Sequence, residues 1–227
     1  MNPIRLTIAA FLAAASVATA ELRTLTLRVY LHDPVHPRGV DLSAAGPDDA
    51  EVPLPFRAGK LSLPVEVQLE DHLLLLRSDD GKPAASTKVP ATQKRAVAIV
   101  LPDPDKESAP PYRVVLVDDA PDRFRWGESR AVNLLGIDAA IEAGEHRVAL
   151  RAGRTTAVPA VRQVNEFNIA QTNFFYRSGE EWLPFTERQL QYVDDSRRIF
   201  LIHATPGSRR PFVTTLVDYQ PVDPGAE

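Results

Sequence analysis

Apolar and polar residues alternate in several short segments of the chain. From residue 24 to residue 31, every second side chain is leucine or valine. A period of two places these side chains on one face of a β-strand. Residues 61–67 repeat the pattern, and Pro64 on the opposite face predicts an edge strand, because proline cannot donate to a ladder of hydrogen bonds.

Shorter apolar runs predict further strands. They lie at residues 73–76, 97–101, 114–117, 129–135, 139–141, 147–150, 162–168, 173–177, 198–203 and 214–219. In the second half, turn residues separate these runs at short intervals, which is typical of a β-meander. Only Thr186–Tyr192 favours a helix of one or two turns, since Thr186 and Gln189 have the spacing of a capping box.

Three polar, proline-rich stretches interrupt the first half, at residues 33–59, 78–95 and 102–111, and they are predicted to be long loops. The fold is therefore expected to be all-β: an antiparallel β-sandwich or open barrel with at most one short helix. No internal repeat is visible, and each half alone would hold few strands. Residues 21–227 are expected to form a single domain with a polar C-terminal tail.

The first twenty residues have the features of a signal peptide. Arg5 precedes the apolar run at residues 6–15, and Ala18-Thr19-Ala20 is a small-x-small cleavage pattern. The run is too short and too rich in alanine to span a bilayer core of ~20 residues, although an N-terminal anchor is the alternative. We expect cleavage after Ala20 and an exported chain, periplasmic or extracellular, without a membrane span.

Charge and composition limit the function classes. The 227 residues include 26 Lys and Arg against 30 Asp and Glu, so the formal net charge is −4, and there is no cysteine. A slightly acidic chain argues against nucleic-acid binding. The lack of cysteine excludes disulfides and thiolate chemistry. Glycine-rich phosphate loops are also missing, so we expect no nucleotide or other cofactor.

Two segments contain residues of the types that bind metal ions. His32 and His36 have a His-x-x-x-His spacing, but it follows a strand into a loop rather than lying on a helix. Asp103–Glu107 has acidic residues at the first, third and fifth positions of a calcium loop, yet its sixth position is Ser108 and its twelfth is Val114. Solvated loop residues are the favoured interpretation of both segments, and no metal site is predicted.

Catalytic motifs are equally incomplete. Gly127-Glu128-Ser129 lacks the second glycine of a nucleophile elbow. The doublets Asp48-Asp49, Asp79-Asp80, Asp118-Asp119 and Asp194-Asp195 are typical of turns. Two of these carboxyls would form a glycosidase pair only if the fold set them ~5–9 Å apart.

The best ligand-binding candidates are Arg123, Arg125 and Trp126 in the segment Arg123-Phe124-Arg125-Trp126. An exposed aromatic ring beside guanidinium groups suits a sugar ring, a carboxylate or a partner's side chain. The alternative is that Phe124 and Trp126 close one end of the sandwich while the arginines stay in solvent. A carbohydrate-binding module would also need Trp126 or Trp182 coplanar with another exposed aromatic.

Asn133 interrupts the apolar run at residues 131–135. A buried amide is tolerated when its donors and acceptor are paired, so Asn133 is predicted to bind backbone groups that become free where the strand bends or ends.

One resemblance rests on the segment Arg130-Ala131-Val132-Asn133-Leu134, followed by Gly136, by Ala143-Gly144-Glu145 and by Arg197-Arg198-Ile199-Phe200. Across residues 60–219 the chain resembles a family of uncharacterised exported bacterial proteins. The resemblance implies a β-sandwich and no assigned activity. The leading hypothesis is an exported, non-catalytic binding or structural module of the cell envelope with a protein or glycan partner. The alternatives are a glycan hydrolase with an Asp/Glu pair and a carbohydrate-binding module.

Overall fold

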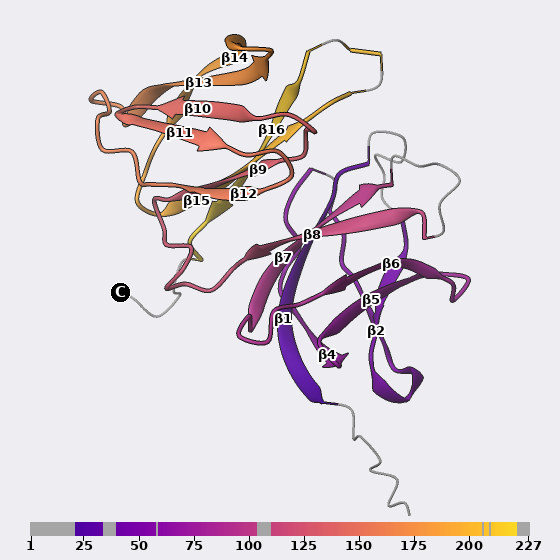
Figure 1. Cartoon of the computed structure of the whole chain (residues 1–227). Coiled ribbons are helices and arrows are strands. Elements are labelled where there is room, and N and C mark those ends of the chain that lie inside the picture. Colours follow the sequence, from indigo (N-terminus) through magenta and orange to yellow (C-terminus); the bar gives the residue numbers. More distant parts are fainter. Residues whose placement is uncertain are drawn as a thin grey trace, which may run out of the picture.

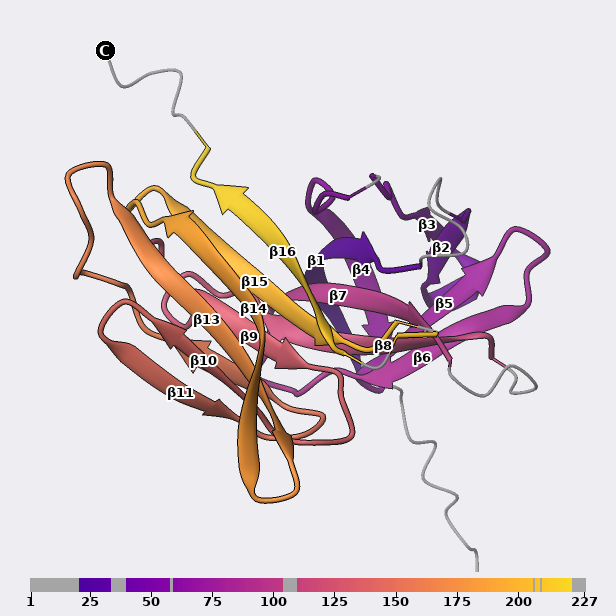
Figure 2. The ribbon, with the colours of Figure 1, turned by 90° about the horizontal axis from the view of Figure 1, so that it is seen from above.

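The structure is a computed structural model that describes residues 21–33, 40–57, 59–103, 110–205, 207–208 and 210–221. The signal-peptide prediction lies outside these residues. The described chain is all-β, with strands β1 to β16 and one short 3-10 turn at Pro47–Asp49, which confirms the predicted class. The strands form two groups that lie side by side (Figures 1 and 2). In the described part of the chain, no helix has the length and apolar character to cross a membrane.

The first group contains the strands of the N-terminal half. They are β1 (Leu22–Leu31), β2 (Leu42–Ala45), β3 (Glu51–Pro53), β4 (Val65–Glu70), β5 (Leu73–Ser78), β6 (Pro83–Lys88), β7 (Arg95–Pro102) and β8 (Tyr112–Asp118). One layer has the order β4-β1-β7-β8 and the other β3-β2-β5-β6, and the β4–β5 hairpin joins them. Leu25, Leu27, Leu74 and Leu76 pack between the layers in one buried cluster.

The second group contains the strands of the C-terminal half. They are β9 (Ser129–Asn133), β10 (Ala139–Ala143), β11 (His146–Leu150), β12 (Thr155–Val158), β13 (Ile169–Ser178), β14 (Glu181–Gln191), β15 (Ser196–His203) and β16 (Phe212–Tyr219). Two four-stranded sheets, β12-β9-β15-β16 and β11-β10-β13-β14, enclose a second cluster that includes Ile141, Phe174 and Phe200.

The two halves have the same topology. In each half the first strand pairs antiparallel with the fourth and parallel with the seventh, and the seventh pairs with the eighth. The other sheet of each half has the order third, second, fifth, sixth. The sequence predicted antiparallel pairing, but β1 pairs with β7, and β9 with β15, in parallel. The chain is therefore a structural duplication that the sequence did not reveal.

A third apolar cluster joins the halves. It holds Tyr30, Ile99 and Val117 from the first half and Ile199 and Leu216 from the second. Since side chains alternate along a strand, β7 turns residues 96, 98 and 100 to its own core and residues 97, 99 and 101 to the other half. This burial on both faces explains why residues 97–101 form an uninterrupted apolar run. We call this contact surface the junction.

Most of the predicted strands are present, but the predicted helix is not. Thr186–Tyr192 falls largely within β14, which pairs with β13 along its whole length. The cross-strand partners satisfy the backbone, and this tertiary context overrides a short local capping pattern. Arg162–Asn168 was predicted to be a strand and is instead an irregular connection, whereas β12 was not predicted.

Two other expectations need correction. Residues 33–59 contain β2 and β3, and residues 78–95 contain β6, so these stretches are not simply loops. The edge-strand prediction at Pro64 is right only in part: β4 lies at the edge of its layer and pairs with β5 only through Glu70 and Leu73, but it begins at Val65, after the proline. The proline immediately precedes the ladder and removes no hydrogen bond from it. That the two halves behave as one domain stays a prediction.

Candidate functional site

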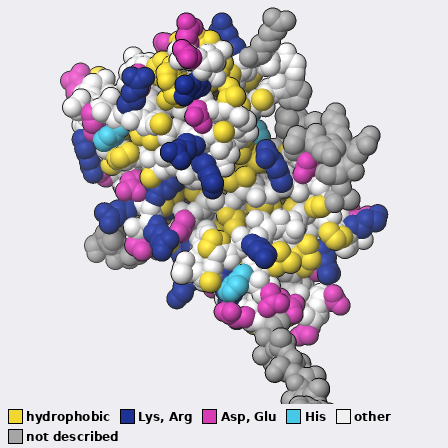
Figure 3. Space-filling view, viewed as in Figure 1, with side chains coloured by type: hydrophobic (Ala, Val, Ile, Leu, Met, Phe, Trp, Pro, Cys, Tyr) yellow, Lys and Arg dark blue, Asp and Glu magenta, His cyan; other side chains and the backbone are white. Residues whose placement is uncertain are grey.

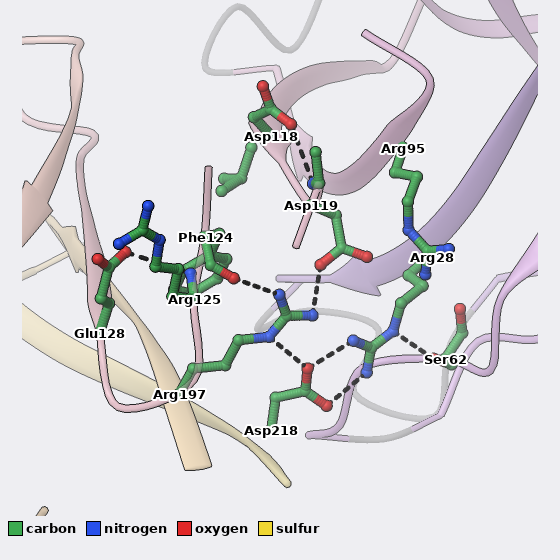
Figure 4. A network of polar contacts seen from close by, with 12 residues as sticks. Arg28, Ser62, Arg95, Asp118, Asp119, Phe124, Arg125, Glu128, Arg197 and Asp218 are labelled. Carbon is green, nitrogen blue, oxygen red and sulfur yellow. Dashed lines mark hydrogen bonds and ion pairs between the residues drawn. The ribbon is translucent and has the colours of Figure 1, made fainter. Parts of the chain in front are cut away.

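The junction contains a buried network of charged side chains (Figure 4). The Arg197 guanidinium donates to Asp119 Oδ1 at 2.5 Å, to Asp218 Oδ2 at 2.9 Å and to the Phe124 carbonyl at 3.0 Å. The side chains of Arg197 and Asp119 are only 7% and 1% exposed. Every nitrogen of Arg197 therefore has an acceptor in a region with little water.

A second arginine completes the network. Arg28 binds Asp218 in a bidentate pair at 2.6 and 2.8 Å, and its Nε donates to the Ser62 carbonyl at 3.2 Å. Arg28 comes from the first half and Asp218 from the second, whereas Arg197 of the second half binds Asp119 of the first. Each half thus supplies an arginine to an aspartate of the other half, but the two pairs are not equivalent, because Arg28 lies on a first strand and Arg197 on a seventh strand.

The network draws on equivalent positions of the duplicated topology. Each half has one arginine on its first strand and another at the start of its seventh strand. An aspartate at the end of the eighth strand lies opposite the second arginine. These residues are Arg28, Arg95 and Asp119 in the first half and Arg130, Arg197 and Asp218 in the second. The register of the strands places all six on the faces that meet.

Burial and neighbouring charges act in opposite directions on the two carboxyls. Burial raises the pKa of Asp119, and the charges of Arg197, Arg28 and Arg95 oppose this rise. Burial alone would also raise the pKa of Asp218, but the hydrogen bonds and charges of Arg28 and Arg197 hold it below its ordinary value. Each of the two carboxylates is therefore paired with at least one guanidinium group.

The predicted ligand-binding segment borders this network. Phe124 is buried, and its ring lies between the guanidinium groups of Arg130 and Arg197, at 4.7 and 4.6 Å from the centroid. Trp126 is half-buried with Arg197 4.5 Å from its ring centroid. Arg123 and Arg125 are exposed, and Arg123 lies 3.4 Å from Asp118. Phe124 thus closes the junction, while the ligand-binding role of Arg123, Arg125 and Trp126 stays a prediction.

A cleft of about 640 Å³ begins at the residue that follows this segment. Separate parts of the second half line it: Gly127, the connection from β12 to β13, the connection from β14 to β15, and the end of β16. The lining residues are Gly127, Val161, Arg162, Val164, Asn168, Gln191, Tyr192, Val193, Asp194, Asp195 and Tyr219.

Hydrogen bonds hold the irregular wall of the cleft in place. The Glu145 carboxylate accepts from the backbone nitrogens of Arg162 and Gln163, at 2.8 and 3.0 Å. The Asn165 side chain accepts from the backbone nitrogens of Phe167 and Ile169, and the Tyr192 nitrogen donates to the Asn168 carbonyl at 2.6 Å. This wall is preorganised for binding, because it would lose little further conformational entropy when a ligand binds.

The cleft combines an aromatic ring with polar side chains of both signs. Tyr219 is 65% exposed. Arg162 and Asp194 form an exposed ion pair at 2.7 Å. Asn168 and Asp195 also line the cleft, and within the described chain their exposed side chains make no hydrogen bond. The site therefore offers donors, acceptors and a flat apolar surface together.

A buried cation lies beside the cleft. Arg198 stacks on the Tyr192 ring at 4.9 Å and donates to the Gln191 carbonyl, and both of these residues line the cleft. Burial lowers the pKa of Arg198, and its Nη1 has no hydrogen-bond partner among the described residues. No carboxylate in the described chain pairs with it. Arg198 thus contributes uncompensated positive charge behind the cleft.

The structure describes only part of the two segments considered for metal binding. His36 and residues 104–107 lie outside the described residues. His32 contacts His203 instead, with the ring centroids 4.3 Å apart. No group of three or more potential ligands clusters within the ranges that the structure describes.

The aspartate doublets have separate places. Asp80 pairs with Lys82, Asp118 accepts from the Ala120 nitrogen, and Asp119 belongs to the junction. Only Asp194 and Asp195 border the cleft described above. Sequence reasoning noted this doublet but missed Arg162, Asn168 and Tyr219, because no local pattern shows that three distant segments meet.

Neither tryptophan meets the requirement for a sugar platform in the described chain. The Trp126 ring is covered by Arg197, and Trp182 lies half-buried on β14. As to known proteins, no family model matches the chain, and no curated protein matches it.

Proposed function

We propose that the protein is an exported, non-catalytic binding module of the cell envelope and that it binds an uncharged glycan in the cleft beside β16. The observation that carries this proposal is the exposed Tyr219 ring in a polar cleft whose Asn168 and Asp195 side chains are unpaired in the described chain. Export rests on the signal-peptide pattern of residues 1–20.

The chemistry of the cleft favours a sugar over other ligands. Each sugar hydroxyl both donates and accepts, and the cleft supplies amide, carboxylate and guanidinium groups from Asn168, Asp195 and Arg162. The C–H face of a sugar ring can pack on Tyr219, as apolar surfaces pack on aromatic rings. The charges of Arg162 and Arg198 balance those of Asp194 and Asp195 at the cleft, so the site favours neither an anionic nor a cationic ligand.

The junction supports a binding role by fixing the two halves against each other. The ion pairs of Arg28 with Asp218 and of Arg197 with Asp119 hold the loop that contains Arg125 and Trp126 next to Gly127 of the cleft. A ligand longer than the cleft would then pass over that loop. Charges of both signs are interspersed over one face of the molecule, without a large single-sign patch (Figure 3).

Calorimetric titration with neutral envelope oligosaccharides tests the proposal. Tyr219→Ala should weaken binding roughly ten-fold or more, which is typical for loss of a stacking ring. Phe212→Ala is the matched control, since Phe212 is an exposed aromatic at the other end of β16 and does not line the cleft. Equal affinities of the two variants would refute the assigned site.

A hydrolase is the competing function because Asp194 and Asp195 border the same cleft. Release of reducing ends from the bound oligosaccharide, abolished in Asp195→Asn, would establish catalysis and contradict a purely binding role. We expect no such release, since the Asp194 carboxylate is held by Arg162.

A further inference from the structure

The two ends of the junction differ in chemistry. At one end lies the network of Arg28, Arg197 and their aspartates. At the other end, His32 follows β1 and His203 ends β15, and their rings meet edge to face with centroids 4.3 Å apart. These two histidines come from different halves of the chain, so their contact links the halves at this end.

The surrounding structure fixes both rings. The His32 nitrogen donates to the Val100 carbonyl at 2.9 Å, which continues the pairing of β1 with β7. His203 Nε2 lies 3.0 Å from Thr214 Oγ1, and its ring stacks on Phe212 at 6.3 Å. Neither ring can move far from the other while the halves stay together.

The duplicated topology provides an internal comparison. Tyr30 lies opposite Ile99 in the first half, and Val132 lies opposite Leu201 in the second. Two residues further along each strand, His32 therefore corresponds to Leu134 and His203 to Leu101. Both leucines belong to the apolar cluster of the junction. One pair of equivalent positions is thus apolar, and the other can take up protons.

We propose that the His32–His203 contact is an acid-sensitive latch: protonation of the rings opens this end of the junction, while the Arg–Asp network keeps the halves attached at the other. Two imidazolium rings at this separation repel each other strongly in a half-buried site. The halves would then swing about the network. This inference goes beyond the proposed function and does not depend on the ligand of the cleft.

The groups that face the two rings fit this role. Asp33 favours the charged form of His32 and itself accepts from the Tyr112 hydroxyl at 3.3 Å. Tyr30, Phe212 and Thr214 are neutral, and the Ala204 carbonyl lies 3.3 Å from His203 Nδ1. Among the described residues around the rings, Asp33 is the one carboxylate, and it does not balance two imidazolium charges.

The pKa shifts of the two rings also favour opening at acid pH. Burial lowers the pKa of His32 from 6.5 to about 4, with a further contribution from His203 and an opposing one from Asp33. Burial also lowers the pKa of His203. Because both rings bind protons more weakly in the closed junction than in water, the closed form is favoured above pH 6.5 and loses this advantage as the pH falls.

The absence of cysteine makes a direct distance measurement possible. Glu66→Cys on β4 and Glu187→Cys on β14 place two spin labels at exposed positions, one on each half. Pulsed electron paramagnetic resonance then reports the distance distribution across the junction from about pH 7.5 to about pH 4. We expect a second distance population that grows as the pH falls, while far-ultraviolet circular dichroism stays unchanged.

Three variants test whether the two histidines cause the acid response. His32→Leu combined with His203→Leu copies the equivalent pair Leu134 and Leu101 and should abolish the second population. If this variant does not fold, His32→Gln alone should do the same, since it removes the repulsion and keeps a polar side chain. His146→Gln on β11 is the control and should leave the acid response intact.

Three results would overturn the latch. The first is a distance distribution that does not change with pH in the labelled parent. The second is an acid response that persists in the variants at positions 32 and 203. The third is loss of the β-sheet dichroism together with the distance change, which would mean global unfolding rather than an opening.

Discussion

Asp119 and Arg197 lie 78 residues apart in the chain and form a buried ion pair with a nitrogen–oxygen distance of 2.5 Å. Asp119 ends the first half, and Arg197 lies at the start of β15 in the second. The pair therefore links the two sandwiches at the junction.

Arg197→Met should lower the free energy of unfolding by about 3–5 kcal/mol, because it leaves the buried carboxylates of Asp119 and Asp218 uncompensated. Urea denaturation measures this change. Arg198→Met is the matched control at the next residue, on the opposite face of β15. No carboxylate in the described chain pairs with Arg198, so its loss should cost about 1 kcal/mol or less. Equal losses would show that the network does not stabilise the fold.

The unaltered chain should unfold in a single thermal transition at neutral pH, because the junction couples the two sandwiches. Arg197→Met should separate this transition into two, since each half retains its own apolar cluster. Differential scanning calorimetry distinguishes the cases. Two transitions already present in the parent would mean that the halves are independent domains.

Asn133→Ala should cost about 1–3 kcal/mol of unfolding free energy, because three backbone partners, two of them buried, lose their hydrogen bonds. The Asn133 amide donates to the carbonyls of Ile137 and Leu150, each at 2.9 Å, and accepts from the Leu135 nitrogen at 3.0 Å. Asn173→Ala on β13 is the control, with an expected cost of about 0.5 kcal/mol or less. A variant at position 133 that is as stable as the parent would contradict this structural role.

Gly144→Ala should be more destabilising than Gly153→Ala. Both glycines have positive φ, +53° and +67°, and alanine pays roughly 1–2 kcal/mol for this conformation. A Cβ at position 144 would also collide with Val161 in the wall of the cleft, whereas position 153 is open. The collision should add about 1–3 kcal/mol. Thermal melts measure both variants, and Val161→Ala should relieve part of the first loss; equal losses would exclude the collision.

Stability at acid pH should depend on which aspartate of the network is replaced. The folded-state pKa of Asp218 is below the ordinary value of 3.8, so its contribution is present above pH 3.8 and is lost as the pH falls through the folded value. Asp218→Asn should therefore flatten the loss of stability at low pH. The pKa of Asp119 is raised, so Asp119→Asn should steepen that loss. The urea midpoint of each variant, measured at several pH values, tests both assignments. If the midpoints of the two variants depended on pH in the same way, both assignments would be wrong.

Local patterns determined the class of the fold. Alternation along residues 24–31 and the short apolar runs at residues 73–76 and 198–203 are strands, because a strand needs only its own period of two to bury one face. The hydrogen bonds of Asn133 followed from the same logic, since an amide inside an apolar strand needs partners nearby. The exposed arginines at positions 123 and 125 were also recognised from their segment alone.

Pairing over long distances was decided only by the tertiary structure. Thr186–Tyr192 contributes to a strand because β13 lies beside it, and β2, β3 and β6 form within polar segments because neighbouring strands supply their hydrogen bonds. The cleft needs Gly127, Arg162, Asp194 and Tyr219 from four places in the chain. The junction is even harder to predict from the sequence than the cleft. Its ion pairs and its histidine contact depend on the packing of two duplicated sheets, and the energy of such packing lies in contacts between residues that no local period connects.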